Sequence, residues 1–247
     1  MSSPTPDDSD QRARAGRRLV LWDIDGTLVR AGPAGREALE AGAALTAHLA
    51  EVPFVAMSGK TDQQIVREIF ALAELADEHI DRLMPKALAA VQRALAGAEE
   101  RIRADGMVLP GVREVLERLA ATPGVRQSLV TGNLVANAAL KLTALGLEGW
   151  LDVEVGAYGT DHADRNRLVP IALARVRDQR GECYRPQQVW VVGDTEHDLA
   201  CARAAGVRCL LVGTGTEGFE RVRHLPADAV LPDLADTDAV VRILLAA

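Results

Sequence analysis

The chain has 247 residues and a mass of 26.4 kDa, and its 48% hydrophobic and 26% charged residues exclude collagen-like, low-complexity and largely disordered proteins. A net charge of −7 argues against a general nucleic-acid-binding protein, because binding to the phosphate backbone needs clustered Lys and Arg. The apolar stretches are too short to cross a bilayer or to form a secretory signal core, so we expect no membrane partner and a cytoplasmic location.

The N-terminal segment combines an unstructured start with one buried strand. Residues 1–17 are rich in Ser, Pro, Asp and Arg and lack apolar periodicity, which predicts a disordered tail. The chain is then apolar and continuous over residues 19–24, as a strand buried on both faces should be. It stops at the polar sequence Asp23-Ile24-Asp25-Gly26-Thr27, and we assign residues 18–29 to the first part of a core domain.

Residues 30–107 differ from the rest of the chain in composition and in predicted secondary structure. Three segments rich in Ala and Leu, at 35–50, 61–75 and 79–98, follow one another with no convincing strand among them. This pattern predicts an all-helical cap domain, inserted directly after the first strand. The core domain resumes over residues 108–247, where Leu109-Pro110-Gly111 marks the boundary.

The remainder of the core repeats the order strand, polar loop, helix. Strands expected at 125–130 and 189–192 stop at Thr131-Gly132-Asn133 and at Gly193-Asp194-Thr195. Helical patterns follow at 134–145 and 197–205, and a strand at 229–231 precedes a last short helix. This order predicts an α/β fold, with a parallel, Rossmann-like sheet that carries helices on both faces. Ligands of such sheets bind beyond the carboxyl ends of the strands, where all three polar stops fall.

Four aspartates are expected at this edge of the sheet: Asp23, Asp25, Asp194 and Asp198. Asp23 and Asp25, on either side of one residue at a strand end, suit a nucleophile beside a general acid/base, or oxygen ligands for Mg²⁺. The simpler alternative is a loop of solvated acids. Several carboxylates that converge without a lysine repel one another, and a divalent cation relieves this repulsion. We therefore expect Mg²⁺ as the cofactor.

Thr131, Gly132 and Asn133 stand between a strand and a helix. A hydroxyl and free backbone N–H groups at such a junction can bind a phosphate group. Thr and Asn are also common helix caps, so this segment alone is a weak signal.

Together these segments resemble three motifs of the haloacid dehalogenase superfamily. Asp23-Ile24-Asp25-Gly26-Thr27-Leu28 is similar to its motif one, Thr131-Gly132-Asn133 to motif two, and Gly193-Asp194-Thr195-Glu196-His197-Asp198 to motif four. The helical insertion stands where that superfamily carries a type-one cap, and the resemblance covers roughly residues 18–235. Asp25 makes the chain look like the phosphotransfer members, since those that dehalogenate carbon compounds lack this second aspartate.

The resemblance implies a role for each matching residue. Asp23 would be the nucleophile that forms an aspartyl-phosphate, and Asp25 the acid/base that protonates the leaving oxygen and then activates water. Mg²⁺ would be held by Asp23, the backbone carbonyl of Asp25, and Asp194, with Asp198 as a further ligand or as support. Thr131 and the Gly132 amide, with Asn133 beside them, would bind the phosphoryl oxygens.

One motif of the superfamily is not matched. Its third motif is a lysine ahead of motif four, but no lysine lies between Lys141 and Asp194, and Lys141 falls inside the helix expected at 134–145. With 25 arginines against three lysines in the chain, we expect an arginine in this role, and favour Arg165 over Arg167 because it lies ahead of the next helix. The alternative is that both belong to a solvated helix N-terminus.

Two loops complete the list of candidates. Ser58-Gly59-Lys60-Thr61-Asp62 interrupts the helices of the insertion; Ser58 and Lys60 are candidate substrate contacts, while Thr61 or Asp62 could simply cap the next helix. Gly213-Thr214-Gly215-Thr216-Glu217-Gly218 matches a dinucleotide-binding pattern, but it comes too late in the chain, and we interpret it as a glycine-rich loop of the core.

The leading hypothesis is a Mg²⁺-dependent phosphatase of the phosphoglycolate-phosphatase-like kind, acting on a small phosphorylated metabolite as a monomer or homodimer. A phosphomutase or phosphonate hydrolase of the same superfamily is the nearest alternative. The unmatched lysine also leaves open a catalytically weak binding or regulatory module.

Overall fold

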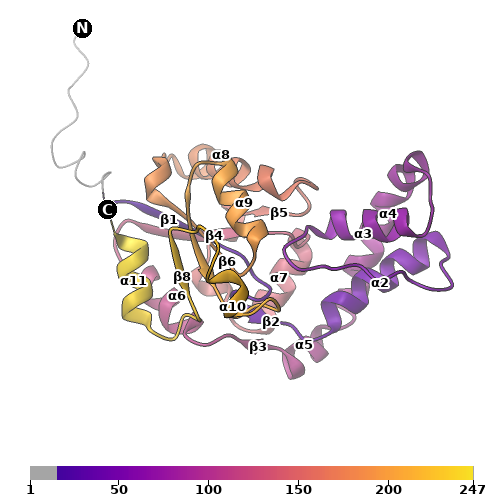
Figure 1. Cartoon of the computed structure of the whole chain (residues 1–247), viewed down its shortest axis with the longest axis horizontal. Helices are drawn as coiled ribbons and strands as arrows, with labels where there is room; N and C mark the ends of the chain where they lie inside the picture. The colour runs from indigo at the N-terminus through magenta and orange to yellow at the C-terminus, as the bar shows by residue number, and fades with distance from the viewer. Residues whose placement is uncertain (1–15, 247) are drawn as a thin grey trace, which may run out of the picture.

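The computed structural model describes residues 16–246, and the predicted tail at 1–17 falls almost entirely outside them. Figure 1 shows two parts side by side: a sheet covered by helices, and a smaller group of helices beyond one edge of it. The start of the N-terminal strand and the C-terminal helix lie at the far side of the sheet part, away from the smaller group.

The sheet confirms the predicted α/β, Rossmann-like fold. Its six strands are all parallel and lie in the order β5-β4-β1-β6-β7-β8. They are β1 Arg18–Trp22, β4 Val125–Thr131, β5 Ala157–Tyr158, β6 Val189–Gly193, β7 Arg208–Val212 and β8 Ala229–Leu231. The first strand ends at Trp22, two residues before the expected end, and the two-residue β5 is a strand that the sequence pattern missed.

Helices cover both faces of this sheet. Side chains alternate along β1, so that Val20 and Trp22 enter one apolar cluster while Leu19 and Leu21 enter the other. Because both faces are buried, the strand reads as a continuous apolar run. The helices of this part are α6 Val112–Ala120, α7 Val135–Ala144, α8 Leu168–Arg180, α9 Glu196–Ala204, α10 Phe219–Val222 and α11 Thr237–Leu245.

The smaller part has its own apolar core, built by helices at the three predicted positions and by a further helix at Glu99–Asp105 that the sequence pattern did not predict. These helices are α2 Ala34–Ala47, α3 Asp62–Leu72, α4 Asp77–Ala96 and α5 Glu99–Asp105. Gly42 lets α2 approach α4 closely, since a Cβ there would lie 2.5 Å from Val91 Cγ2. Leu134 and Ala144, at the two ends of α7, join the same cluster and fix this part against the sheet part.

A short strand pair stands where the chain passes between the two parts. β2 Val29–Arg30 and β3 Met107–Val108 pair antiparallel, next to the predicted boundaries at 29/30 and 107/108. The sequence pattern predicted no strand at either place. Two residues on each side carry too little periodicity to be recognised.

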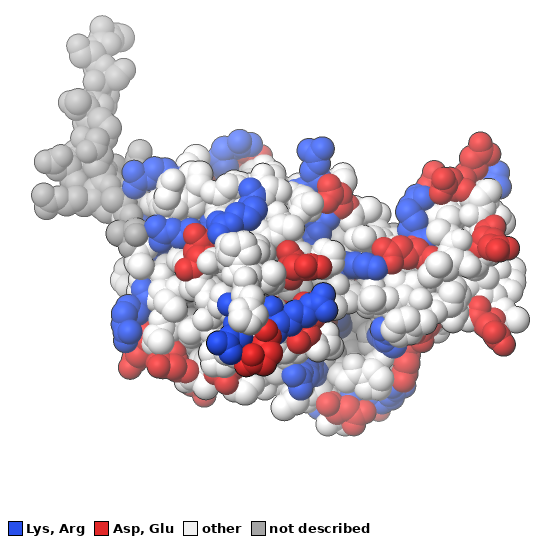
Figure 2. All heavy atoms as spheres, viewed as in Figure 1, with Lys and Arg blue, Asp and Glu red and all other residues white. Residues whose placement is uncertain are grey.

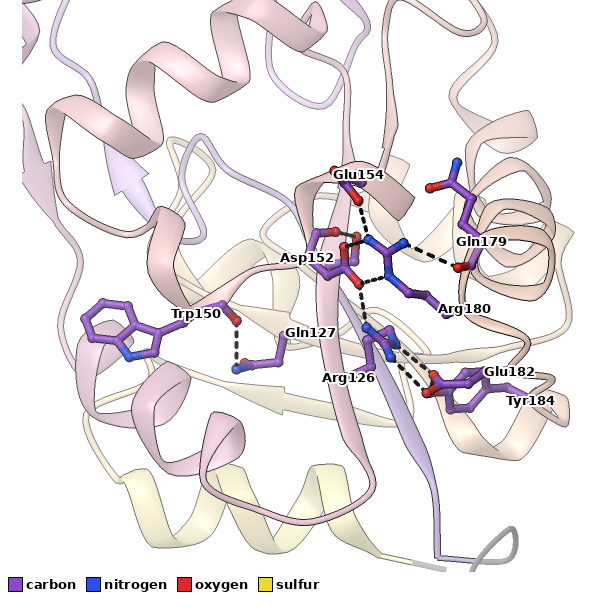
Figure 3. A network of polar contacts seen from close by, with 10 residues as sticks. Arg126, Gln127, Trp150, Asp152, Glu154, Gln179, Arg180, Glu182 and Tyr184 are labelled. Atoms are coloured by element: carbon purple, nitrogen blue, oxygen red, sulfur yellow. Dashed lines mark hydrogen bonds and ion pairs between the residues drawn. The ribbon is translucent and has the colours of Figure 1, made fainter.

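The amino end of the sheet holds a network of charged side chains (Figure 3). Arg126, at the start of β4, donates to both carboxylate oxygens of Glu182 and to Asp152. Arg180, in the last turn of α8, donates to Asp152 and Glu154. The network therefore ties β4 to the end of α8, at the edge of the sheet opposite the polar strand ends.

The surface carries charges of both signs. Figure 2 shows Lys and Arg interspersed with Asp and Glu over the visible face. Among the helices of residues 16–246, none combines the length and the apolar character needed to span a membrane.

Candidate active site

Three aspartates meet at the carboxyl ends of two neighbouring strands. Asp23 follows β1, Asp194 follows β6, and Asp198 lies in the first turn of α9. One carboxylate oxygen of each lies within 4.8 Å of the others, and all three side chains are buried. β1 and β6 are adjacent and parallel, so their ends place Asp23 beside Asp194, as the sequence order predicted.

The charges of this cluster are poorly compensated. Burial raises the pKa of Asp194 to about 9, and the nearby Asp198 and Asp23 carboxylates add to the effect. Burial also raises the pKa of Asp23, to about 6, although the Arg165 guanidinium acts in the opposite direction. A set of oxygen ligands with excess negative charge fits a hard divalent cation such as Mg²⁺.

Asp194 and Asp198 differ in how far their oxygens are already engaged. Asp198 Oδ2 accepts from the Thr195 backbone N–H at 3.1 Å and from Thr195 Oγ1 at 2.7 Å, and its Oδ1 accepts from Arg165. Asp194 accepts from Thr27 Oγ1 at 3.2 Å, through Oδ1. Asp194 therefore has more capacity left for a cation, whereas Asp198 mainly orients Thr195 and Arg165.

Arg165 lies inside this cluster. Its Nη2 is 3.1 Å from Asp23 Oδ1 and also contacts Asp198, and Nη1 donates to the Gly59 carbonyl at 3.1 Å. Burial lowers the pKa of Arg165, but the Asp198 and Asp23 carboxylates raise it by more, so it stays above its ordinary value. Arg165 is thus a buried cation in contact with Asp23, the expected nucleophile, and its role in place of the superfamily's lysine stays a prediction.

The alternative that Arg165 belongs to a solvated helix N-terminus is wrong. A 3₁₀ turn over Arg165–Arg167, capped by the Asp164 carboxylate, points the first arginine inward. Arg165 is 5% exposed, whereas Arg167 lies at the surface.

Asp25 faces a different set of partners. Asn133 Nδ2 donates to Asp25 Oδ2 at 2.8 Å and to Thr131 Oγ1 at 2.8 Å, so the predicted strand-end residues do meet. Lys141 Nζ donates to the same Asp25 oxygen at 2.5 Å. The sequence pattern placed Lys141 inside a helix and gave it no contact with the site; it does lie within α7, but its long side chain reaches back to the strand ends.

The loop before α3 lies directly against these strand ends. The Asp62 backbone N–H donates to the Gly132 carbonyl at 2.8 Å, and Thr61 Oγ1 donates to the Ala163 carbonyl at 2.7 Å. Thr216 Oγ1 lies 3.4 Å from Ser58 Oγ, and Lys60 Nζ pairs with Glu68. Ser58 and Lys60 both line the cavity, and their contact with a substrate stays a prediction.

A cavity of about 580 Å³ lies between the loop and the strand ends. Its wall includes the predicted residues of both parts, among them Asp23, Asp25, Ser58, Lys60, Thr131, Gly132, Asn133, Arg165 and Asp194. Asp198 lies behind this wall. The volume is in the range of sites for small molecules.

Besides Lys141, two further contributors to the site were missed. Asp62 is buried, and its Oδ2 accepts from the Leu134 backbone N–H and from Asn137; the proposed capping role did not indicate a contact across the two parts. Gly215 packs so closely that a Cβ would lie 1.7 Å from Asp194 Oδ2. The glycine-rich loop at 213–218 therefore packs directly against the carboxylate cluster, and its glycines were the available signal.

Comparison with known proteins assigns the chain to a family. The model of the haloacid dehalogenase-like hydrolases matches residues 20–203, more than half of the chain, which therefore belongs to this family. The predicted resemblance is confirmed.

The chain is also similar to individual phosphatases and to solved structures. A phosphoglycolate phosphatase of Rhodospirillum rubrum is 32% identical over 88% of this chain and 88% of its own length. A phosphoglycolate phosphatase of Pseudomonas putida is 31% identical over 90% of this chain and 76% of its own length. The crystal structure of a predicted phosphatase from Clostridium acetobutylicum has a TM-score of 0.67 at 13% identity, over 92% of this chain and 99% of that one, which shows that the fold is shared.

Proposed function

We propose that this chain is a Mg²⁺-dependent phosphatase that hydrolyses a small phosphorylated metabolite through an aspartyl-phosphate on Asp23. The observation that carries the proposal is the position of Asp23: its carboxylate lies between Asp194, Asp198 and Arg165 on the wall of a cavity that Asp25 also lines. A nucleophile, an acid/base and a cation thus share one site.

In the first half-reaction an Asp23 oxygen attacks phosphorus, and the bond from phosphorus to the leaving oxygen breaks. Asp25 gives its proton to that oxygen as it leaves. In the second half-reaction Asp25 takes a proton from water, whose oxygen attacks phosphorus and releases Asp23. Arg165, 3.1 Å from Asp23, reduces the repulsion between this carboxylate and the incoming phosphate.

Asp23, the Asp25 carbonyl and Asp194 would hold Mg²⁺, with Asp198 close behind them. The bound ion would supply charge neutralisation for the phosphoryl oxygens. Thr131, Gly132 and Asn133 lie on the same cavity wall and would contact those oxygens. Asp194, whose pKa is raised by burial beside two further carboxylates, supports this assignment because a divalent cation would remove the repulsion.

We assign residues 30–107 to a cap and residues 18–29 and 108–247 to the catalytic core. The loop at 58–62 supports this division, because it lies on the cavity wall opposite the strand ends, where the leaving group would emerge. The two relatives named for phosphoglycolate make that compound the first substrate to test. The chain would act in the cytoplasm, on a small metabolite.

Phosphate release from a set of phosphate monoesters, including 2-phosphoglycolate and p-nitrophenyl phosphate, tests the proposal. We expect turnover with Mg²⁺ and none with EDTA, and none from Asp23→Asn under either condition. Equal rates with EDTA, or full activity of Asp23→Asn, would contradict the proposed chemistry. A product in which the phosphoryl group has moved to another hydroxyl would instead indicate a phosphomutase.

A further inference from the structure

Lys141 is a buried lysine whose environment the family motifs do not explain. It is 4% exposed, and its ammonium donates to Asp25 Oδ2 at 2.5 Å and to Asn133 Oδ1 at 2.7 Å. Lysine is rarely buried unless it is paired, because removing an ammonium from water is costly. A side chain of this kind at a cavity wall therefore needs a reason to be there.

Helix geometry explains how Lys141 reaches the site. Asn137 and Lys141 are four residues apart on α7 and share one face of the helix, and both line the cavity. Asn137 donates to Asp62 at 3.1 Å, so both polar side chains on this face of α7 form hydrogen bonds with carboxylates at the cavity. The pattern is a polar stripe on an otherwise apolar helix.

Among residues 16–246, the two buried cations of the cavity wall are divided between the two aspartates of Asp23-Ile24-Asp25. Arg165 contacts Asp23, and Lys141 contacts Asp25. Lys141 consequently does not replace the family's third-motif lysine, a role that we predict for Arg165. Its partner is the residue assigned to proton transfer, which separates its role from that of Arg165.

The contacts of Asp25 are one-sided. Oδ2 accepts from Lys141 and from Asn133, whereas Oδ1 accepts from no side chain or backbone group of residues 16–246. The Asp25 side chain is 46% exposed, so without these two donors it would have several rotamers open to it. Holding Oδ2 fixes the direction in which Oδ1 points.

We propose that Lys141 is a positioning residue that holds Asp25 for proton transfer, with Oδ1 as the oxygen that carries the proton. This inference rests on the proposed function. Oδ1–H gives its proton to the leaving oxygen while the bond from that oxygen to phosphorus breaks. The negative charge that this transfer leaves on Asp25 is met by the Lys141 ammonium at Oδ2. The later transfer from water returns a proton to Oδ1.

Leaving groups provide a test that a merely structural role would not pass. Nitrophenolate is a good leaving group and departs without a proton. An alkoxide is a poor leaving group and must be protonated as it leaves. Hydrolysis of an alkyl phosphate therefore depends on Asp25 in the first half-reaction much more than hydrolysis of p-nitrophenyl phosphate does. Single-turnover rates of leaving-group release by Lys141→Met would be measured with Mg²⁺ on p-nitrophenyl phosphate and on the alkyl phosphate that the wild type hydrolyses fastest, because the second half-reaction, which also uses Asp25, is common to both esters. We expect a loss of about 10²-fold on the alkyl ester and less than about threefold on the aryl ester.

Two further variants separate positioning from folding. In an Asp25→Asn background, Lys141→Met should cost less than about threefold on the alkyl ester, because the two residues act as a unit. Lys141→Gln keeps an N–H donor without the charge and should recover part of the loss. Lys86→Met, which removes an exposed lysine of α4 away from the cavity, is the matched control and should change neither rate.

The outcomes are distinct. Equal losses of Lys141→Met on both esters, or a full further loss in the Asp25→Asn background, would overturn the positioning role while the phosphatase assignment stands. If the wild type hydrolysed neither ester, both the proposed function and this inference would be overturned.

Discussion

Two clusters of arginine and carboxylate side chains occupy opposite ends of the same sheet. At the amino end, Arg126 and Arg180 pair with Asp152, Glu154 and Glu182, and these side chains are 16–72% exposed. At the carboxyl end, Arg165 lies among Asp23, Asp194 and Asp198, and the side chains that pair with it are at most 6% exposed.

The pKa values of carboxyl groups in the two clusters are shifted in opposite directions. Hydrogen bonding from Arg126 lowers the pKa of Glu182 to about 2, while burial and neighbouring carboxylates raise the pKa of Asp194 to about 9. Both clusters consist of arginines and acidic residues. The direction of the pKa shift is therefore decided by the number of neighbouring cations and by the access of water. Compensated and hydrated pairs contribute to stability, whereas an uncompensated buried cluster is a candidate site for chemistry.

The largest expected effect comes from Asp23, the proposed nucleophile. Asp23→Asn removes the attacking oxygen and should lower phosphate release by about 10⁴-fold or more. It also removes one buried negative charge, so the thermal midpoint without metal should not fall. Activity close to wild type, with an intact fold, would place the nucleophile elsewhere in the carboxyl-end cluster.

Arg165 should matter for both activity and stability. Arg165→Ala leaves three buried carboxylates without a cation, and breaking a buried ion pair of this kind costs about 3–5 kcal/mol. Arg165→Lys keeps the charge but loses the forked geometry that spans Asp23, Asp198 and the Gly59 carbonyl, so it should recover only part of each loss.

Urea unfolding and phosphate release, each measured with Arg167→Ala as the control, check this expectation. The exposed Arg167 should change the free energy of unfolding by less than about 0.5 kcal/mol. Reversed results for the two arginines would assign the cation of the site to Arg167.

Mg²⁺ should stabilise the protein more as the pH rises. The folded pKa of Asp194, about 9, lies above its ordinary value of about 4, so its contribution to stability is present below pH 4 and is lost as the pH rises toward 9. Mg²⁺ competes with that proton, so the rise in thermal midpoint that it produces should grow over the same window.

Two matched variants test which carboxylate binds the ion. Asp194→Asn should remove most of the Mg²⁺ effect and its pH dependence. Asp198→Asn should remove less, because Asp198 already accepts from Thr195 and Arg165. Mg²⁺ titrations monitored by thermal unfolding at several pH values measure both, and equal losses would contradict the proposed order.

The sequence predicted the parts of the fold and site that follow from strand ends. Asp23, Thr131 and Asp194 stand directly after or at the end of apolar strands, and parallel neighbours bring such ends together. This local pattern was sufficient for the fold class and for the carboxylate cluster. The two-residue strands were missed because a segment of two residues is too short to show any periodicity.

Lys141 and the burial of Arg165 could not be read from the same pattern. Lys141 depends on the face that α7 turns to the sheet and on the reach of a long side chain. The inward direction of Arg165 depends on a 3₁₀ turn capped by Asp164. Both are tertiary effects, and a lysine four residues after an asparagine is equally compatible with a solvated helix face.

The smallest effect is expected at the amino end of the sheet. Glu182 accepts two hydrogen bonds from Arg126 and one from Tyr184, so Glu182→Gln should lower the free energy of unfolding by about 1 kcal/mol at neutral pH. Phosphate release should be unchanged, because Arg126 and Glu182 lie at the other end of the sheet from the cavity. Glu154→Gln, at a more exposed position whose one ion-pair partner within residues 16–246 is Arg180, is the control and should cost less.

The pH dependence of this last effect has the opposite sign to that of Asp194. The folded pKa of Glu182, about 2, lies below its ordinary value of about 4.3, so its contribution is present above that value and is lost as the pH falls toward 2. The difference between wild type and Glu182→Gln should therefore be constant from about pH 5 to pH 8 and should disappear in acid. Urea unfolding across this range measures it. A difference that grew as the pH fell would contradict the lowered pKa of Glu182. A loss of phosphate release in Glu182→Gln would show that the two ends of the sheet are not independent and would break the contrast between a stabilising cluster and a reactive one.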